Sequence, residues 1–180
     1  MTDRPEDVDR VRFTLDGRPV SARPDENLLE IAHRAGAEIP RLCYMQGLPA
    51  DGNCRACVVE IEGERALAPA CCRPPLEGMV VNTAGDRPRR ARKMVIELLQ
   101  SDMPETPCIP GNELQRWADK LAMGAPRFPG RRQPPPDDSH PAISVNLDAC
   151  IQCTRCLRAC RDAQVNNVIG YGGRGSASHI

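Results

Sequence analysis

The chain has 180 residues, its 24 basic and 24 acidic side chains leave no formal net charge, and only 3% of its residues are aromatic. This length fits one domain or two small ones, and the balanced charge excludes a basic surface for nucleic acid or membranes. No apolar run reaches the roughly 18 residues of a membrane span, and the polar N-terminus does not resemble a secretory signal. We therefore expect a cytoplasmic protein whose ten cysteines are metal ligands rather than disulfides.

Residues 10–84 are expected to form a compact α+β domain. Its first two strands flank Asp16-Gly17, a pair typical of hairpin turns. A helix with Asp25 as its N-terminal cap and Gly36 at its end should follow. The expected strands are 11–15, 20–23, 58–61, 66–71 and 79–83. Two strands, a helix, a long loop and further strands are the order of a β-grasp domain.

Residues 85–142 are expected to be a helical connector and a proline-rich extended linker. The first helix should span 86–101, and a shorter one should begin at Asn112. Four basic residues near the start of the first helix are a solvated face or a docking site for an acidic partner: Arg89, Arg90, Arg92 and Lys93. The expected apolar face of that helix is formed by Ala91, Met94, Val95, Leu98 and Leu99.

The long loop of the first domain carries a cysteine motif of spacing C-x10-C-x2-C-x13-C. Soft thiolates can hold zinc or an iron–sulfur cluster, but zinc ribbons usually use two C-x2-C pairs and only one is present here. Three cysteines on one loop and a fourth from a later strand are typical of plant-type [2Fe–2S] sites. The predicted ligands are Cys43, Cys54, Cys57 and Cys71.

A second motif, C-x2-C-x2-C-x3-C, opens the C-terminal segment 143–180. In bacterial ferredoxins the first three thiolates of this run bind one [4Fe–4S] cluster, and the fourth binds the other cluster of a pair. The spacing therefore predicts a [4Fe–4S] site, with zinc as the remaining alternative. The residues concerned are Cys150, Cys153 and Cys156, with Cys160 as the fourth.

Both motifs resemble a known family. The first interval of ten residues is similar to that of the large iron–sulfur subunit of respiratory complex I, of NAD-reducing hydrogenases and of NAD-dependent formate dehydrogenases. The stretch from Asp148 to Ile180 closely resembles formate dehydrogenase α subunits. Relatives carry one His and three Cys for a further cluster in the connector, where this chain has Met103 and Cys108. The resemblance thus implies that this middle cluster is lost, and Cys72 is expected to be a buried spare thiol.

The resemblance also implies that a second cysteine run follows the first in a complete two-cluster domain. That run supplies the fourth ligand of the first [4Fe–4S] cluster, and Cys160 is then a ligand of the second. Residues 143–180 are accordingly expected to be the first half of such a domain in a truncated chain. The alternatives are that a partner chain supplies the ligand, or that the site is empty or oxygen-labile.

The function implied by the resemblance is single-electron transfer between a metal-pterin site and a flavin/NAD-binding subunit, most closely in a formate dehydrogenase. A diaphorase subunit of a hydrogenase or complex I-like enzyme and a zinc-stabilised interaction module are the alternatives. No catalytic constellation or nucleotide-binding loop is found in the sequence. The three histidines, His33, His140 and His179, are not expected to be ligands.

Overall fold

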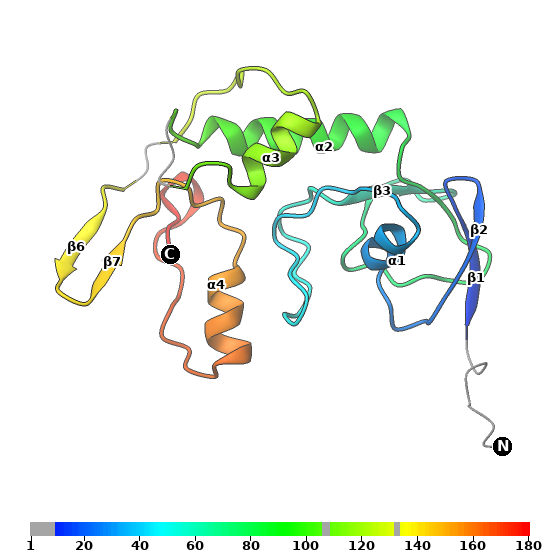
Figure 1. Cartoon of the computed structure of the whole chain (residues 1–180), viewed down its shortest axis with the longest axis horizontal. Coiled ribbons are helices and arrows are strands. Elements are labelled where there is room, and N and C mark those ends of the chain that lie inside the picture. Colours follow the sequence, from blue (N-terminus) through cyan, green and yellow to red (C-terminus); the bar gives the residue numbers. More distant parts are fainter. Residues whose placement is uncertain (1–9, 106–108, 132–133) are drawn as a thin grey trace. The chain divides into compact units, whose positions relative to one another are not determined.

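The structure is a computed structural model, and it describes residues 10–105, 109–131 and 134–180. The chain divides into two compact units. The first unit contains the residues up to 41 together with 55–92. The second contains the loop 42–54 and the chain from 93 onward. Figure 1 shows the sheet of the first unit and the helices and hairpin of the second.

A five-stranded sheet of order β2-β1-β5-β3-β4 is the framework of the first unit. β1 (Val11–Leu15) and β2 (Arg18–Ala22) pair antiparallel. Asp16 and Gly17 join them with φ values of 48° and 77°, as a type I′ turn requires. This confirms the predicted hairpin. The second strand begins earlier than predicted because a two-residue turn allows pairing to start at once.

Within the five-stranded sheet, the strand that comes last in the sequence, β5, lies in the middle. β5 (Val80–Asn82) pairs parallel with β1 and antiparallel with β3 (Val58–Ile61). β4 contains only Ala68 and Pro69, so the predicted strand over 66–71 is largely wrong. Pro69 has no N–H to donate to a ladder, and the chain turns directly after it. The mixed sheet with its helix is nevertheless the predicted α+β arrangement.

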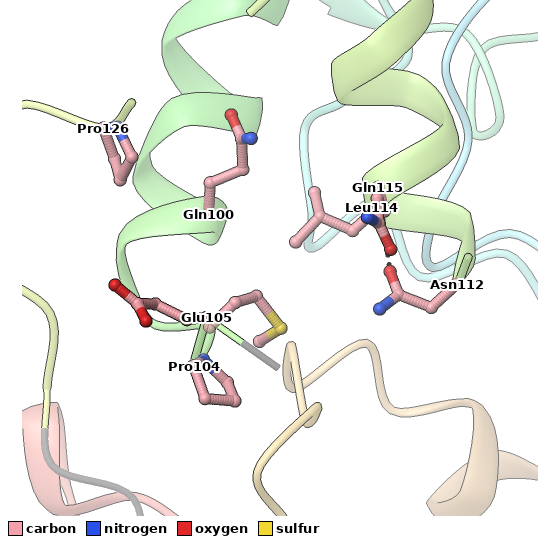
Figure 2. Close-up of a pocket in the computed structure, with 8 residues that line it drawn as sticks. Gln100, Pro104, Glu105, Asn112, Leu114, Gln115 and Pro126 are labelled. Atoms are coloured by element: carbon pink, nitrogen blue, oxygen red, sulfur yellow. Dashed lines mark hydrogen bonds between the residues drawn. The ribbon is translucent and has the colours of Figure 1, made fainter. Parts of the chain in front are cut away.

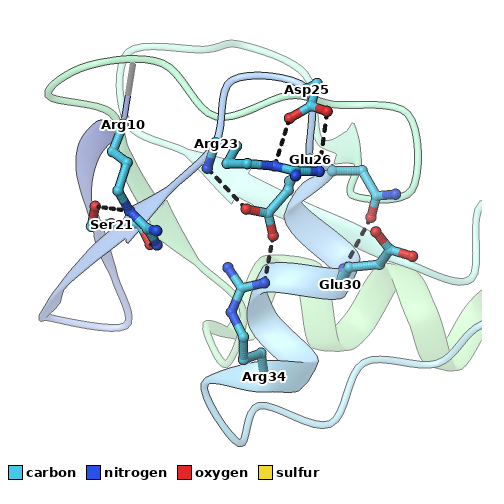
Figure 3. A network of polar contacts seen from close by, with 8 residues as sticks. Arg10, Ser21, Arg23, Asp25, Glu26, Glu30 and Arg34 are labelled. Atoms are coloured by element: carbon cyan, nitrogen blue, oxygen red, sulfur yellow. Dashed lines mark hydrogen bonds and ion pairs between the residues drawn. The ribbon is translucent and has the colours of Figure 1, made fainter. Parts of the chain in front are cut away.

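The helix of the first unit, α1 (Leu28–Arg34), begins later than predicted. Its N-terminal cap is Asn27, whose side chain accepts a hydrogen bond of 2.9 Å from the backbone N–H of Glu30. The predicted cap Asp25 is wrong because it lies too early to reach the first turn, and it pairs with Arg23 instead (Figure 3). The helix packs its buried face toward the core through Leu28, Leu29, Ile31 and Ala32.

The long helix α2 (Asp86–Ser101) has the predicted bounds and contributes residues to both units. Its predicted apolar face is wrong, since Met94 is 40% and Leu98 is 47% exposed. The buried positions follow a spacing of four along another face, through Pro88, Arg92 and Ile96. Because an arginine lies on this face, hydrophobic periodicity alone could not identify it.

In the second unit, α3 (Glu113–Lys120) begins at the predicted cap. The side chain of Asn112 accepts a hydrogen bond of 3.0 Å from the N–H of Gln115. Leu114 and Ala118 form the buried side of this helix. The cap therefore agrees with the sequence prediction.

Part of the predicted linker is a two-stranded sheet. β6 (Asp137–His140) and β7 (Ile143–Val145) pair antiparallel, and all of their residues are exposed. In the turn between them, the N–H of Ala142 donates to Nδ1 of His140 over 3.1 Å. Pairing begins at β6, where residues with free N–H groups follow the prolines.

The C-terminal part of the second unit contains short helical elements. α4 (Arg155–Arg158) continues into a π-helical turn, Ala159–Ala163, and a 3-10 turn follows at Gly175–Ala177. Across the residues that the structure describes, no helix combines the length and apolarity needed to cross a membrane.

Candidate metal centres

Two of the first four predicted ligands lie in the first unit, where strand pairing brings their backbones together. Val58 pairs with Pro69 in the β3–β4 ladder. One residue further along, the N–H of Ala70 donates to the carbonyl oxygen of Cys57 over 3.2 Å. Cys71 directly follows Ala70, and Cys57 and Cys71 are each only 1% exposed. The β3–β4 pairing therefore brings the backbone of Cys57 to the residue that precedes Cys71, and both thiols lie in a water-poor environment.

The other two predicted ligands, Cys43 and Cys54, belong to the loop 42–54 and are buried and half-buried. Gly47 and Gly52 in this loop have φ values of 87° and 64°, a left-handed conformation that glycine adopts without strain. Arg55, which follows Cys54, also has a positive φ of 57°. A non-glycine residue in this region is uncommon and is found where the surroundings impose it.

The extra cysteine of this motif differs from its prediction. Cys72 is exposed rather than buried, and its Sγ lies 3.6 Å from Sγ of Cys71. The exposure of Cys72 results from the turn that ends β4. In this turn the N–H of Cys72 donates to the carbonyl oxygen of Pro69 over 3.0 Å, and the side chain points outward. Cys72 therefore offers a natural comparison with its buried neighbour.

The second motif places three cysteines within seven residues of the second unit, with Cys150 and Cys153 half-buried and Cys156 exposed. Burial raises the pKa of Cys156, and negative charge on Cys153 and Cys150 raises it further. Burial, and then the negative charge of the same three cysteines, raise the pKa of Tyr171, whose hydroxyl donates to the carbonyl oxygen of Gln152 over 3.3 Å. Because the ligand form of cysteine is the thiolate, binding of a cation at Cys156 has to displace its proton.

The backbone of the second motif repeats a feature of the first. Gln152 and Thr154 have φ values of 53° and 62°. Together with Arg55 in the first motif, they place one left-handed non-glycine residue in every C-x2-C interval. Alternation of left- and right-handed residues turns successive backbone N–H groups to one side and creates a concavity that favours anions. An iron–sulfur cluster with thiolate ligands is such an anion.

Cys160 is separated from the other three thiols by the helical turns. It is buried, and its Sγ accepts a hydrogen bond of 3.2 Å from the backbone N–H of Val168. Its carbonyl oxygen accepts another, of 3.0 Å, from the N–H of Asn166. These bonds hold Cys160 in place at the end of the helical turns.

The feature that sequence reasoning missed is a set of contacts between the two cysteine segments within the second unit. Arg158 is only 3% exposed. Its guanidinium donates to the carbonyl oxygens of Cys43 and Pro49 on one side and, over 3.3 Å, to that of Cys153 on the other. One buried side chain thus links the loop 42–54 to the second motif. Only its place two residues after Cys156 could have signalled it.

Two further residues of the second motif bond to the same loop. Arg155 donates to the carbonyl oxygen of Tyr44 over 3.0 Å and forms an ion pair with Glu113. The hydroxyl of Thr154 donates to the carboxylate of Asp51 over 2.7 Å. The contact between the segments therefore consists of charged and polar hydrogen bonds, with backbone carbonyls as the main acceptors.

The predicted loss of the middle cluster concerns Met103 and Cys108. Cys108 lies outside the described residues. Met103 lines a cavity of about 270 Å³ in the second unit (Figure 2). The other lining residues are Gln100, Pro104, Glu105, Asn112, Leu114, Gln115 and Pro126. Over the ranges described, no three His, Cys, Asp or Glu side chains converge as ligands of one metal ion.

Residues 8–86 match the family described as "2Fe-2S iron-sulfur cluster binding domain", which confirms the predicted [2Fe–2S] domain. The mitochondrial NADH-ubiquinone oxidoreductase 78 kDa subunit of Candida albicans is 35% identical over 177 residues, covering 94% of this chain and 25% of that protein. The NADP-reducing hydrogenase subunit HndD of Solidesulfovibrio fructosivorans is 34% identical over 173 residues, covering 91% and 30%. The chain thus spans only about a quarter to a third of the length of these relatives.

The chain matches a larger share of one relative of known structure. A chain in the crystal structure of NAD⁺-reducing [NiFe]-hydrogenase in the H₂-reduced state is 32% identical, with a TM-score of 0.80. The match covers 93% of this chain and 73% of that one. With its [2Fe–2S] domain, the chain therefore belongs to the iron–sulfur protein family that includes this hydrogenase chain.

Proposed function

We propose that the chain is an iron–sulfur electron-transfer module of a nicotinamide-linked oxidoreductase. In this proposal Cys43, Cys54, Cys57 and Cys71 hold a [2Fe–2S] cluster. A [4Fe–4S] cluster is held by Cys150, Cys153 and Cys156, and its fourth ligand comes from further sequence or from a partner. Cys160 is then a ligand of a second cluster. The proposed divisions are a [2Fe–2S] domain over 10–84, a connector over 85–142 and half of a ferredoxin-like domain over 143–180.

The observation that carries the proposal is the Arg158 link. Electron tunnelling falls steeply with distance, so a relay needs its centres close together. Because one guanidinium bonds to the carbonyls of Cys43 and Cys153, a ligand of each proposed cluster lies at the same side chain. Nothing in a zinc-stabilised interaction module requires such proximity between two cysteine sites.

The cysteines suit the proposed clusters chemically. Thiolates are the usual ligands of both cluster types, and each cluster carries one electron at a time at a potential set by charge, burial and hydrogen bonds to sulfur. Plant-type [2Fe–2S] centres have potentials near roughly −400 mV, which suits exchange with nicotinamide through a flavin. The names of the relatives all refer to enzymes that act on NAD or NADP. We therefore place the flavin that would exchange electrons with the nicotinamide on a partner chain.

The enzyme type is proposed at a finer level. The relatives favour a hydrogenase or an NADH–ubiquinone oxidoreductase type of assembly. A formate dehydrogenase with a metal-pterin partner is the second candidate, favoured by Met103 at the position where the connector of complex I carries a histidine ligand. Co-purification from the native host separates the candidates by the metal of the partner: nickel indicates a [NiFe]-hydrogenase type, molybdenum or tungsten a formate dehydrogenase, and neither metal an NADH–ubiquinone oxidoreductase type.

The proposal is tested on the full chain purified without oxygen. We expect brown protein with iron and acid-labile sulfide in near-equal amounts, and two electron paramagnetic resonance signals after reduction with dithionite. Cys54→Ser should remove only the [2Fe–2S] signal and Cys153→Ser only the [4Fe–4S] signal. Cys72→Ser, which changes an exposed thiol beside Cys71, is the matched control and should keep both.

Colourless protein that contains zinc alone would refute the electron-transfer proposal. A [4Fe–4S] signal that survives Cys153→Ser would refute the second ligand set while leaving the first intact.

A further inference from the structure

Arg92 is a buried cation in the first unit with one nitrogen left without a partner. The side chain is 6% exposed. Its Nε donates to the carbonyl oxygen of Val58 over 2.9 Å, and its Nη1 donates to that of Thr83 over 2.8 Å. Its Nη2 is inaccessible to solvent and has no hydrogen-bond partner among the described residues. A buried donor without an acceptor is costly and is retained where it has a role.

The backbone around Arg92 is held firmly. Thr83 is buried, and both its N–H and its hydroxyl donate to the carboxylate of Asp16 over 2.6 Å. Val58 directly follows Cys57 and pairs with Pro69 in the sheet. The guanidinium is therefore fixed between two rigid carbonyls, one of them adjacent to a proposed cluster ligand.

The charge of Arg92 is not neutralised within the described part of the chain, where no carboxylate forms an ion pair with it. Burial lowers the pKa of Arg92, whereas the thiolate of Cys57 and then Asp16 act in the opposite direction. An arginine side chain stays protonated in proteins despite such burial. Arg92, bonded to the residue that follows Cys57, thus brings a permanent positive charge into a region from which water is excluded.

These features fit an anionic cluster. A [2Fe–2S] centre with four thiolates is negatively charged, and its reduction converts one ferric ion to ferrous and adds one negative charge. A nearby fixed cation stabilises the reduced form more than the oxidised form, and N–H donors to the sulfurs act in the same direction. The buried Nη2, which has no acceptor among the described residues, is a donor available for this role.

We propose that Arg92 tunes the [2Fe–2S] centre, raising its reduction potential by placing a buried guanidinium charge and a spare N–H donor beside Cys57. Arg92 is a tuning residue rather than a ligand. The inference rests on the proposed ligation by Cys57.

Arg92→Gln is compared with Arg90→Gln, which removes the same charge from an exposed position of the same helix. The full chain is titrated with redox mediators, and the [2Fe–2S] signal is followed by electron paramagnetic resonance. We expect Arg92→Gln to lower the ratio of reduced to oxidised cluster at least tenfold at a fixed potential, a shift of about 59 mV for one electron. Arg90→Gln should shift this ratio by less than about twofold, because water screens its charge.

The inference would be overturned if Arg92→Gln kept a normal [2Fe–2S] signal and its cluster had the same reduction potential as that of Arg90→Gln. The proposed function would still stand. Absence of a [2Fe–2S] signal from the wild-type chain would overturn both.

If Arg92→Gln does not retain its cluster, wild-type protein labelled with ¹⁵N only in its arginine guanidinium groups decides the question. Pulsed resonance of the reduced cluster should show a ¹⁵N coupling that Arg92→Lys removes. A spectrum identical in both proteins would refute the inference.

Discussion

The first unit and the C-terminal segment 143–180 are held together by different forces. In the first unit, aliphatic side chains from α1 and the sheet form a core that includes Leu29, Val59 and Val81. Within 143–180, the only buried residues are Arg158 and Cys160. Apolar burial therefore stabilises the first region, whereas the second depends on hydrogen bonds from guanidinium groups to backbone carbonyls. A [4Fe–4S] cluster, where bound, adds to the cohesion of the second region.

The largest expected contrast comes from removing an apolar side chain in each region. Leu29 is 2% exposed, and Leu29→Ala should lower the free energy of unfolding by about 3 kcal/mol, since it leaves a cavity. Val168 is 80% exposed, and Val168→Ala should change it by less than about 0.5 kcal/mol. Urea unfolding followed by circular dichroism measures both. Equal losses would mean that apolar packing stabilises both regions alike.

The next contrast concerns the buried arginine of the second region. Arg158→Gln leaves the carbonyl oxygens of Cys43 and Pro49 without their charged donor and should cost about 2 kcal/mol. Hydrogen exchange of the amides in 150–160 should quicken by roughly 30-fold, while exchange in β1 stays unchanged. Arg161→Gln is the control, because Arg161 is exposed and pairs only with Asp162. Faster exchange in the control as well would show that any loss of charge loosens this segment.

The smallest effect is a dependence on pH in the second unit. Arg127 donates to the carboxylate of Glu97 over 2.6 and 2.7 Å and lowers the pKa of Glu97 from 4.5 to about 2. Stability from this pair is therefore complete above pH 4.5 and is lost as the pH falls toward 2. Unfolding of the wild type and of Glu97→Gln should differ at pH 6 and converge near pH 2. A constant difference across this range would show that the pair is not responsible.

Local features of the fold were predictable because their signals lie within a few residues. The Asp16-Gly17 turn has the residue types that positive φ requires, and the bounds of α2 follow from the pattern of the sequence. The Asn112 cap was predicted correctly for the same reason. The Asp25 cap was wrong by two residues, since an acidic residue and an asparagine close to the helix start compete for one role.

The environment of the candidate site was not predictable to the same extent. Cysteine spacing identified the residues, but it carries no information on what surrounds them. Arg92 and Arg158 were expected at the surface or not singled out, because arginine is rarely buried. Their acceptors are backbone carbonyls far away in the sequence, such as Val58 and Cys43, and a carbonyl has no residue-specific signature.

The position of β5 in the sheet has a consequence for biogenesis. β5 lies between β1 and β3 although it follows both in the chain, so the sheet cannot close until residue 82 has left the ribosome. Strand pairings this distant in sequence form late. All four cysteines from 43 to 71 therefore emerge while the scaffold is still open, and the assembly machinery can deliver iron and sulfide to them before burial shuts it out.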